Sequence, residues 1–239
     1  MKTICSSKYG NLFFTYILSE GATSNGAIVL LDGLPSNPSS KDQLMQKLSE
    51  YNYDVFFPRY EGTWESKGKF LERAPSEPII GFIEALGKGE NIGNNKYKAK
   101  KVFLLGASFG GGVALDIAFK YPVDKICVTS PVISFKGVKG IKTLGDYLKT
   151  EHSKNYRFDL KEWQKLIQDE VWNLKNNEIK NPSGILIVAG KNDDQIKESD
   201  VVKFGGTSHI KVITCDLGHI TLSKISDSIL LEILNFFSK

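Results

Sequence analysis

The sequence contains few of the residues that build disulfide frameworks and metal sites. Its 239 residues include three cysteines and three histidines. Cys5, Cys127 and Cys215 are far apart, and each lies in or beside an apolar segment. This spacing fits neither a disulfide scaffold nor a zinc site. We therefore expect free thiols in a reducing compartment, and the sequence indicates neither a metal nor a cofactor.

Long apolar runs and a large excess of one charge are also absent. No segment reaches the roughly 18 apolar residues that a membrane-spanning helix needs, and the N-terminal residues lack the cleavage site of a secretory leader. The net charge is +4 and most basic residues are scattered, which is too weak a bias to indicate nucleic-acid binding. We expect a cytoplasmic protein with no membrane or nucleic-acid partner, and no pattern indicates its oligomeric state.

Apolar segments typical of strands alternate with segments typical of helices. Strands are expected at residues 3–7, 11–18, 27–31, 53–57, 102–105, 125–129, 184–189 and 209–215. Helices are expected at residues 41–50, 76–86, 160–175 and 222–237, and directly after Ser108. The alternation predicts an α/β domain with a mostly parallel sheet covered by helices on both faces. Residues 131–182 contain no obvious core strand and so interrupt this alternation of strands and helices. We expect them to form a mainly helical insertion.

The most informative segment is KVFLLGASFGGGVALDIAFK, at residues 101–120. It predicts a buried strand, a tight turn with Ser108 at its apex, and a helix. Gly106, Ser108 and Gly110 form a G-x-S-x-G pattern, in which glycines remove the Cβ atoms that would collide in so sharp a turn. The turn exposes the serine hydroxyl at the edge of the sheet, where a nucleophile needs to be.

Several other polar residues directly follow expected strands, whose ends share one edge of a parallel sheet. With Ser108 they are Asp32, Arg59, Ser130, Asp193 and His219. A serine nucleophile requires a histidine base that a carboxylate orients. His152 lies in the insertion and His209 begins a strand, so His219 is the expected base. The carboxylate should come from the loop after residues 184–189, where Asp193 and Asp194 compete.

Together these segments resemble the α/β-hydrolase superfamily, in particular its branch of small esterases and peptidases similar to serine aminopeptidases and monoglyceride lipases. The resemblance covers nearly the whole chain and rests on LLDGLP, PRYEGTWES, GASFGGG, GKNDDQI and GHITL. It implies an α/β-hydrolase fold with an eight-stranded sheet, a core of residues 1–130 and 183–239, and a small helical cap of residues 131–182. The family's G-x-x-D pattern, counted from Gly190, assigns the acid to Asp193, with Asp194 as the alternative.

The resemblance also implies an oxyanion hole made by the backbone N–H groups of Leu34 and Phe109. Here the sequence departs from the family, because Asp32-Gly33 replaces the usual His-Gly. A carboxylate near a developing negative charge would oppose catalysis unless it is turned away or paired. Arg59, which also follows a strand, is the expected partner of Asp32. Asp32, Gly33 and Arg59 are therefore candidate residues lining the site.

These residues predict a serine hydrolase that cleaves a small carboxylic ester through an acyl-enzyme. An aminopeptidase, another small peptidase or a thioesterase with the same triad is the alternative. A peptidase would bind the substrate amine of a short peptide with acidic groups such as Asp32, Glu61 and Glu65. A third hypothesis is a non-catalytic binding protein of the same fold. The aspartate in place of the family's histidine favours this hypothesis.

Overall fold

The computed structural model describes residues 2–239 except 22, 93, 94, 137, 173, 175–178 and 180. Eight strands form one sheet, in the order β1 (Cys5–Tyr9), β2 (Leu12–Ile17), β4 (Asp54–Pro58), β3 (Ala27–Leu31), β7 (Val102–Ala107), β8 (Lys125–Thr129), β9 (Ile185–Gly190) and β10 (Lys211–Cys215). The β1–β2 and β2–β4 pairs are antiparallel and all the other pairs are parallel. The predicted mostly parallel, eight-stranded sheet is therefore confirmed. A separate short hairpin, β5 (Asn91–Ile92) and β6 (Asn95–Lys96), lies in the polar connection before β7.

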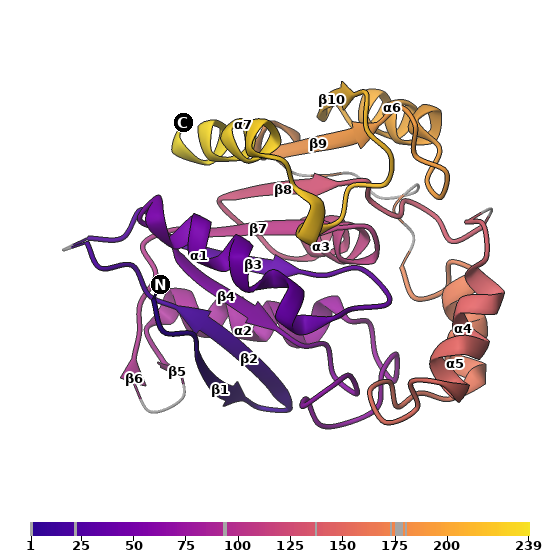
Figure 1. Ribbon diagram of the computed structural model, residues 1–239, viewed down its shortest axis with the longest axis horizontal. Helices are drawn as coiled ribbons and strands as arrows, with labels where there is room; N and C mark the ends of the chain where they lie inside the picture. The colour runs from indigo at the N-terminus through magenta and orange to yellow at the C-terminus, as the bar shows by residue number, and fades with distance from the viewer. Residues whose placement is uncertain are drawn as a thin grey trace.

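The central strands are apolar along their whole length because helices cover both faces of the sheet (Figure 1). Helices α1 (Asp42–Glu50) and α7 (Asp227–Ser238) cover one face. Helices α2 (Ser76–Lys88), α3 (Phe109–Lys120) and α6 (Glu198–Thr207) cover the other. Burial of apolar side chains on both faces is the main favourable contribution to folding of such a layered domain.

Two helices differ from the predicted ones at the C-terminal end of the chain. The segment 222–237 was predicted to be one helix, but α7 begins only at Asp227, after a separate 3₁₀ turn at Leu222–Lys224. Ser226 caps α7 by accepting a hydrogen bond from the N–H of Ile229 at 3.4 Å, and a serine cap overrides the apolar periodicity. Helix α6 was not predicted, because two glycines near its end weaken the helical signal.

The insertion lies beyond the carboxyl ends of the parallel strands and contains α4 (Ile141–Thr150) and α5 (Leu160–Ile167) (Figure 1). The predicted helix at 160–175 is too long: α5 ends at Ile167, and part of the remaining segment lies outside the described residues. Asp169 follows with φ of 61°. Its carboxylate accepts hydrogen bonds from the Ser134 hydroxyl at 2.5 Å and the Phe135 N–H at 2.6 Å, so it ties the end of α5 to the start of the insertion.

The insertion is also fastened to the loop that follows β4. The backbone N–H of Trp64 donates to Asn155 at 2.8 Å, that of Arg157 to Gly62 at 2.8 Å, and that of Phe70 to Arg157 at 2.6 Å. These bonds hold the segment 155–157 against residues 62–70. The division of the chain into a core and a cap over the site stays a prediction.

Candidate active site

Ser108 occupies the sharp turn between β7 and α3. Its backbone angles, φ 54° and ψ −119°, lie outside the regions that non-glycine residues normally adopt. The turn is held by backbone hydrogen bonds: the N–H of Ser108 donates to Thr129 at 3.0 Å, and the N–H of Val132 donates to Ser108 at 3.0 Å. The serine is therefore fixed at the sheet edge with its side chain partly exposed.

The glycines on either side of Ser108 leave room for this turn. A Cβ atom on Gly106 would lie 2.5 Å from the carbonyl oxygen of Gly110. A Cβ atom on Gly110 would lie 2.0 Å from the carbonyl oxygen of Leu31 in β3. Both contacts are with backbone, which cannot move aside as a flexible side chain can. The steric reason for the G-x-S-x-G pattern therefore applies in this structure.

The substitution Gly110→Ala should lower the free energy of unfolding by about 3 kcal/mol, because it drives α3 away from β3. Gly87→Ala is the matched control: Gly87 lies in α2, and among the described residues no atom outside the nearby backbone of that helix lies within 4 Å of its added methyl. That change should be neutral or stabilise the protein by up to about 1 kcal/mol. Urea unfolding of both variants measures the difference, and equal stabilities would contradict the steric argument.

His219 and Asp193 are brought together from the loops after β10 and β9. Nδ1 of His219 lies 2.8 Å from Oδ2 of Asp193. The Asp193 side chain is 2% exposed and that of His219 is 10% exposed, whereas Asp194 is exposed. The contact with the histidine therefore belongs to Asp193. With Nδ1 occupied by a carboxylate, Nε2 of the neutral ring carries the lone pair.

Four donors surround the carboxylate of Asp193. Burial alone would raise its pKa, but hydrogen bonds from His219, the backbone N–H groups of Ile196 and Gln195 and the side chain of Ser130 outweigh that effect and lower the pKa. The two backbone bonds are each 2.9 Å long. Asp193 is therefore ionised at neutral pH. A negative charge at this position is what the partner of an imidazolium needs.

The end of β8 links Ser108 to the histidine loop. The Thr129 carbonyl accepts from the Ser108 N–H, while the Thr129 hydroxyl donates to the carbonyl of Ile220 at 2.9 Å. Ser130 accepts from the N–H of Ile220 at 3.1 Å. The residue after His219 is thus tied to the strand next to the serine. Within the described residues the Ser108 hydroxyl has no hydrogen-bond partner, and such contacts often tighten only when substrate binds.

The two backbone groups expected to form the oxyanion hole lie beside Ser108. Leu34 and Phe109 both line a cavity with the serine. A Cβ atom on Gly33 would lie 3.6 Å from Ser108 Oγ, so the loop that carries Leu34 approaches the nucleophile closely. Neither N–H group donates to an acceptor within the described part of the chain. Both are therefore free to bind an oxyanion.

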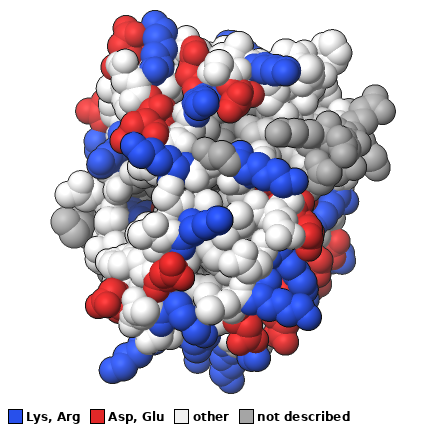
Figure 2. All heavy atoms as spheres, turned by 90° about the vertical axis from the view of Figure 1, so that its right-hand side faces the viewer, with Lys and Arg blue, Asp and Glu red and all other residues white. Residues whose placement is uncertain are grey.

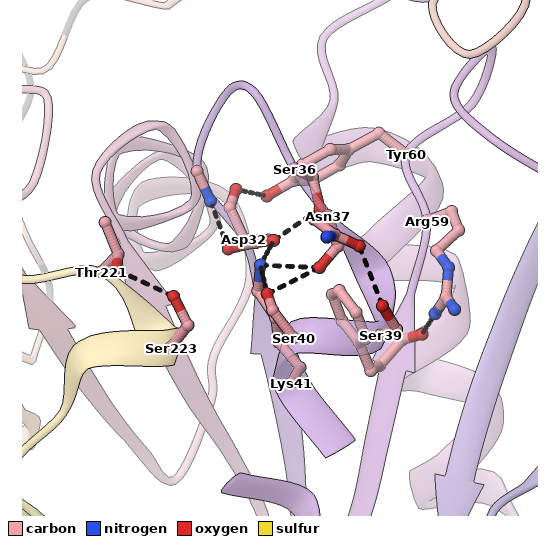
Figure 3. Close-up of polar contacts among 12 residues, drawn as sticks. Asp32, Ser36, Asn37, Ser39, Ser40, Lys41, Arg59, Tyr60, Thr221 and Ser223 are labelled. Atoms are coloured by element: carbon pink, nitrogen blue, oxygen red, sulfur yellow. Dashed lines mark hydrogen bonds and ion pairs between the residues drawn. The ribbon is translucent and has the colours of Figure 1, made fainter. Parts of the chain in front are cut away.

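The expected pairing of Asp32 with Arg59 is wrong. Figure 3 shows Asp32 joined to Lys41, with which it forms an ion pair, while Arg59 lies apart. Arg59 is buried over the ring of Phe57, 4.6 Å from its centroid, and its charged partner is Glu65 at 3.4 Å. It does not line the Ser108 cavity. The arginine follows β4, but its side chain turns back along that strand instead of crossing to β3.

The cavity next to Ser108 has a volume of about 200 Å³. Its lining is mostly apolar and includes Leu34, Phe109, Val132, Phe135, Val138 and Ile141. Trp163 and Trp172 of the insertion do not line it; both are buried. Trp163 packs on Gly145 within the insertion, and Trp172 packs on Phe109 and Phe135. Both tryptophans therefore contribute to packing.

The face of the molecule that carries the insertion has acidic and basic side chains interspersed (Figure 2). Within the described ranges, no three His, Cys, Asp or Glu side chains gather as metal ligands would. Among the helices that the structure describes, none is long and apolar enough to cross a membrane.

Comparison with solved structures identifies the fold. An α/β hydrolase enzyme from a sediment metagenome of the Mar Chica lagoon, Morocco, superimposes with a TM-score of 0.69 at 19% identity, over 98% of this chain and 97% of that one. The esterase Pf2001 of Pyrococcus furiosus gives a TM-score of 0.72 at 14% identity, over 99% and 90%. A Xanthomonas campestris serine hydrolase described as without lid gives 0.62 at 12% identity, over 99% and 91%. The chain therefore has the α/β-hydrolase fold, as the sequence predicted.

Sequence comparison adds nothing to this result. No family profile matches the chain, and no curated protein matches it significantly. These three structural neighbours are 12% to 19% identical to it in sequence, so they establish the fold alone.

Two residues around the site could not be foreseen from the sequence. Lys41 follows a serine pair in a short turn, and nothing near it predicts a buried ammonium. Tyr156 lies within the insertion, yet its hydroxyl accepts a hydrogen bond from the N–H of Ser36 at 2.6 Å. Both contacts join segments that no local pattern connects.

Proposed function

We propose that this protein is a serine hydrolase that cleaves carboxylic esters through an acyl-enzyme. The observation that carries the proposal is the hydrogen bond of His219 to the buried carboxylate of Asp193, in a histidine loop that Thr129 ties to the turn of Ser108. A serine on a strained turn and a histidine with an oriented ring together supply a nucleophile and its base.

In the proposed reaction, Nε2 of His219 takes the Ser108 proton while Oγ attacks the ester carbonyl carbon. The carbonyl oxygen becomes an oxyanion, which the N–H groups of Leu34 and Phe109 bind. Asp193 stabilises the imidazolium through Nδ1–H without taking its proton. The imidazolium then protonates the departing alcohol, leaving the acyl group on Ser108. A water deprotonated by His219 attacks this acyl group. The imidazolium then returns the proton to Ser108 Oγ as the acyl–oxygen bond breaks, which releases the carboxylic acid and regenerates the free serine.

The cavity beside Ser108 supports an acyl group of modest length as the part of the substrate next to the nucleophile. Burying an apolar chain against apolar side chains is favourable by about 0.8 kcal/mol per methylene. Among the described residues, the polar side chains around the cavity, apart from Ser108, belong to Lys139 and Gln195. Since the cavity is only about 200 Å³, long acyl chains would extend beyond it.

The surroundings of Ser108 favour an ester substrate over a peptide with a free amino terminus. A substrate ammonium would need a free carboxylate, but no acidic residue lines the cavity among the described residues. The three acids considered for this role are each bound to a cation elsewhere: Asp32 to Lys41, Glu61 to Arg73 and Glu65 to Arg59.

A substrate panel tests the proposal. The p-nitrophenyl esters of acetate and butyrate should be cleaved with kcat/KM at least about 10-fold above that of the laurate ester, because the laurate chain exceeds the cavity. Aminoacyl p-nitroanilides should give no turnover above that of Ser108→Ala. Faster cleavage of the anilides than of any ester would replace the ester proposal by the peptidase, and no turnover of either would contradict a hydrolase.

A further inference from the structure

The loop that carries the oxyanion-hole donor Leu34 is organised around the carboxylate of Asp32. One oxygen of this carboxylate accepts the N–H of Gly33 at 2.9 Å, and the other accepts the hydroxyl of Ser36 at 2.5 Å. The same second oxygen is paired with the ammonium of Lys41. Figure 3 shows these contacts converging on Asp32. The carboxylate therefore bridges residues on both sides of Leu34.

Lys41 is buried together with Asp32, with only 5% of its side chain exposed. Its ammonium also donates to the carbonyl of Asn37 at 3.2 Å and to the hydroxyl of Ser40 at 3.0 Å. Removing either member of such a pair leaves an uncompensated buried charge. The pair thus closes residues 32–41 into one loop, and the 3₁₀ turn Pro38–Lys41 contacts the turn Leu222–Lys224 that follows His219.

Two tyrosines hold this loop from outside. The hydroxyl of Tyr60 donates to the carbonyl of Asp32 at 3.0 Å, and the N–H of Ser36 donates to the hydroxyl of Tyr156 at 2.6 Å. Tyr156 belongs to the insertion. The peptide groups before and after Leu34 are therefore bound, while the N–H of Leu34 itself stays without an acceptor among the described residues.

We propose that the Asp32–Lys41 ion pair positions the backbone N–H of Leu34 for binding the oxyanion, with Asp32 and Lys41 acting as positioning residues that do not touch the substrate. This inference rests on the proposed esterase function. The carboxylate is compatible with a nearby oxyanion because Lys41 neutralises it and because it bonds within its own loop. The donor binds the tetrahedral state and not the planar ester, so its misplacement lowers kcat and leaves KM almost unchanged.

The variants Asp32→Asn and Lys41→Met test the proposal with p-nitrophenyl butyrate as substrate. Each should lower kcat by about 10- to 100-fold, which is less than the effect of deleting an oxyanion donor, with KM within about 2-fold of the wild type. Because the two residues act as one unit, the double variant should be no slower than the slower single variant. A butyryl trifluoromethyl ketone, which forms a tetrahedral adduct, should bind more weakly by a factor similar to the loss of kcat, whereas butyrate should inhibit all variants equally.

The matched control is Lys47→Met, which breaks the exposed ion pair of Lys47 with Asp227 and should leave kcat unchanged. If Lys41→Met does not fold, two other variants test the same role. Asp32→Asn removes the charge of the carboxylate, and Tyr156→Phe removes the hydroxyl that accepts the Ser36 N–H. Each should lower kcat and leave KM almost unchanged. Folded variants with unchanged kcat, or with a loss confined to KM, would overturn the positioning role. A wild-type protein that neither cleaves the ester nor reacts with a fluorophosphonate would instead refute the proposed function, and the positioning role with it.

Discussion

Replacing Ser108 by alanine will reduce kcat for p-nitrophenyl butyrate by about 10⁶-fold, with only a small change in stability. The loss is this large because the serine forms the covalent bond, and neither the oxyanion hole nor the histidine can replace it. The side chain makes no hydrogen bond within the described residues, so removing its hydroxyl breaks no hydrogen bond there. Steady-state kinetics and thermal unfolding of the two proteins measure both quantities.

The control for this substitution is Ser183→Ala. Ser183 is exposed and lies in the 3₁₀ turn Pro182–Gly184 before β9, at the opposite end of that strand from the site, where its hydroxyl donates to Asn181 at 3.0 Å. The control should retain full activity. A Ser108→Ala variant with more than about 1% of wild-type kcat would show that another group attacks the ester, since removing a triad nucleophile costs far more than this.

Replacing His219 by alanine should lower kcat by about the same factor as replacing Ser108, and the double variant should be no slower than either single variant. Asp193→Asn should lower kcat by about 10⁴-fold, because the amide can hold the ring in the wrong tautomer and cannot stabilise the imidazolium. The adjacent Asp194→Asn is the matched control and should stay within about 2-fold of the wild type, as expected for an exposed side chain outside the triad.

The same variants separate catalysis from stability. Because hydrogen bonds hold the pKa of folded Asp193 below its ordinary value, this group stabilises the folded protein at neutral pH and loses that contribution as the pH falls through its folded pKa. The asparagine variant should therefore lose less stability than the wild type on acidification. If Asp194→Asn, and not Asp193→Asn, abolished turnover, the assignment of the acid would be wrong.

The sheet and the serine turn could be predicted because their causes are local. Five apolar residues in a row at β3, and three in a row at β8, indicate strands buried on both faces. The glycines around Ser108 avoid a steric clash within one strand–turn–helix unit. The histidine could be found by elimination, since there are only three histidines and one of them lies in the loop after the last strand. Asp193 was separated from Asp194 by the spacing of the resembling family, and the contact with His219 agrees with that choice.

What could not be predicted depends on contacts between distant segments. The partner of Asp32 is Lys41 because a 3₁₀ turn folds the lysine back towards β3. The hydrophobic periodicity of the sequence does not predict such a reversal of the chain. Arg59 had the right charge and also followed a strand, but the direction of its side chain is set by packing on Phe57. Helix α6 contains two glycines, which lower its helix propensity, so the packing of its buried apolar side chains on the sheet decides its structure.

The central claim, that Ser108 is the nucleophile of a hydrolase, is tested most directly by covalent labelling. The folded wild-type protein is treated with a fluorophosphonate, and the adduct is located by peptide mass spectrometry. We expect one adduct, on Ser108, that is absent from Ser108→Ala and forms far more slowly in His219→Ala. A folded protein that stays unlabelled, or that carries its adduct on another residue, would contradict it.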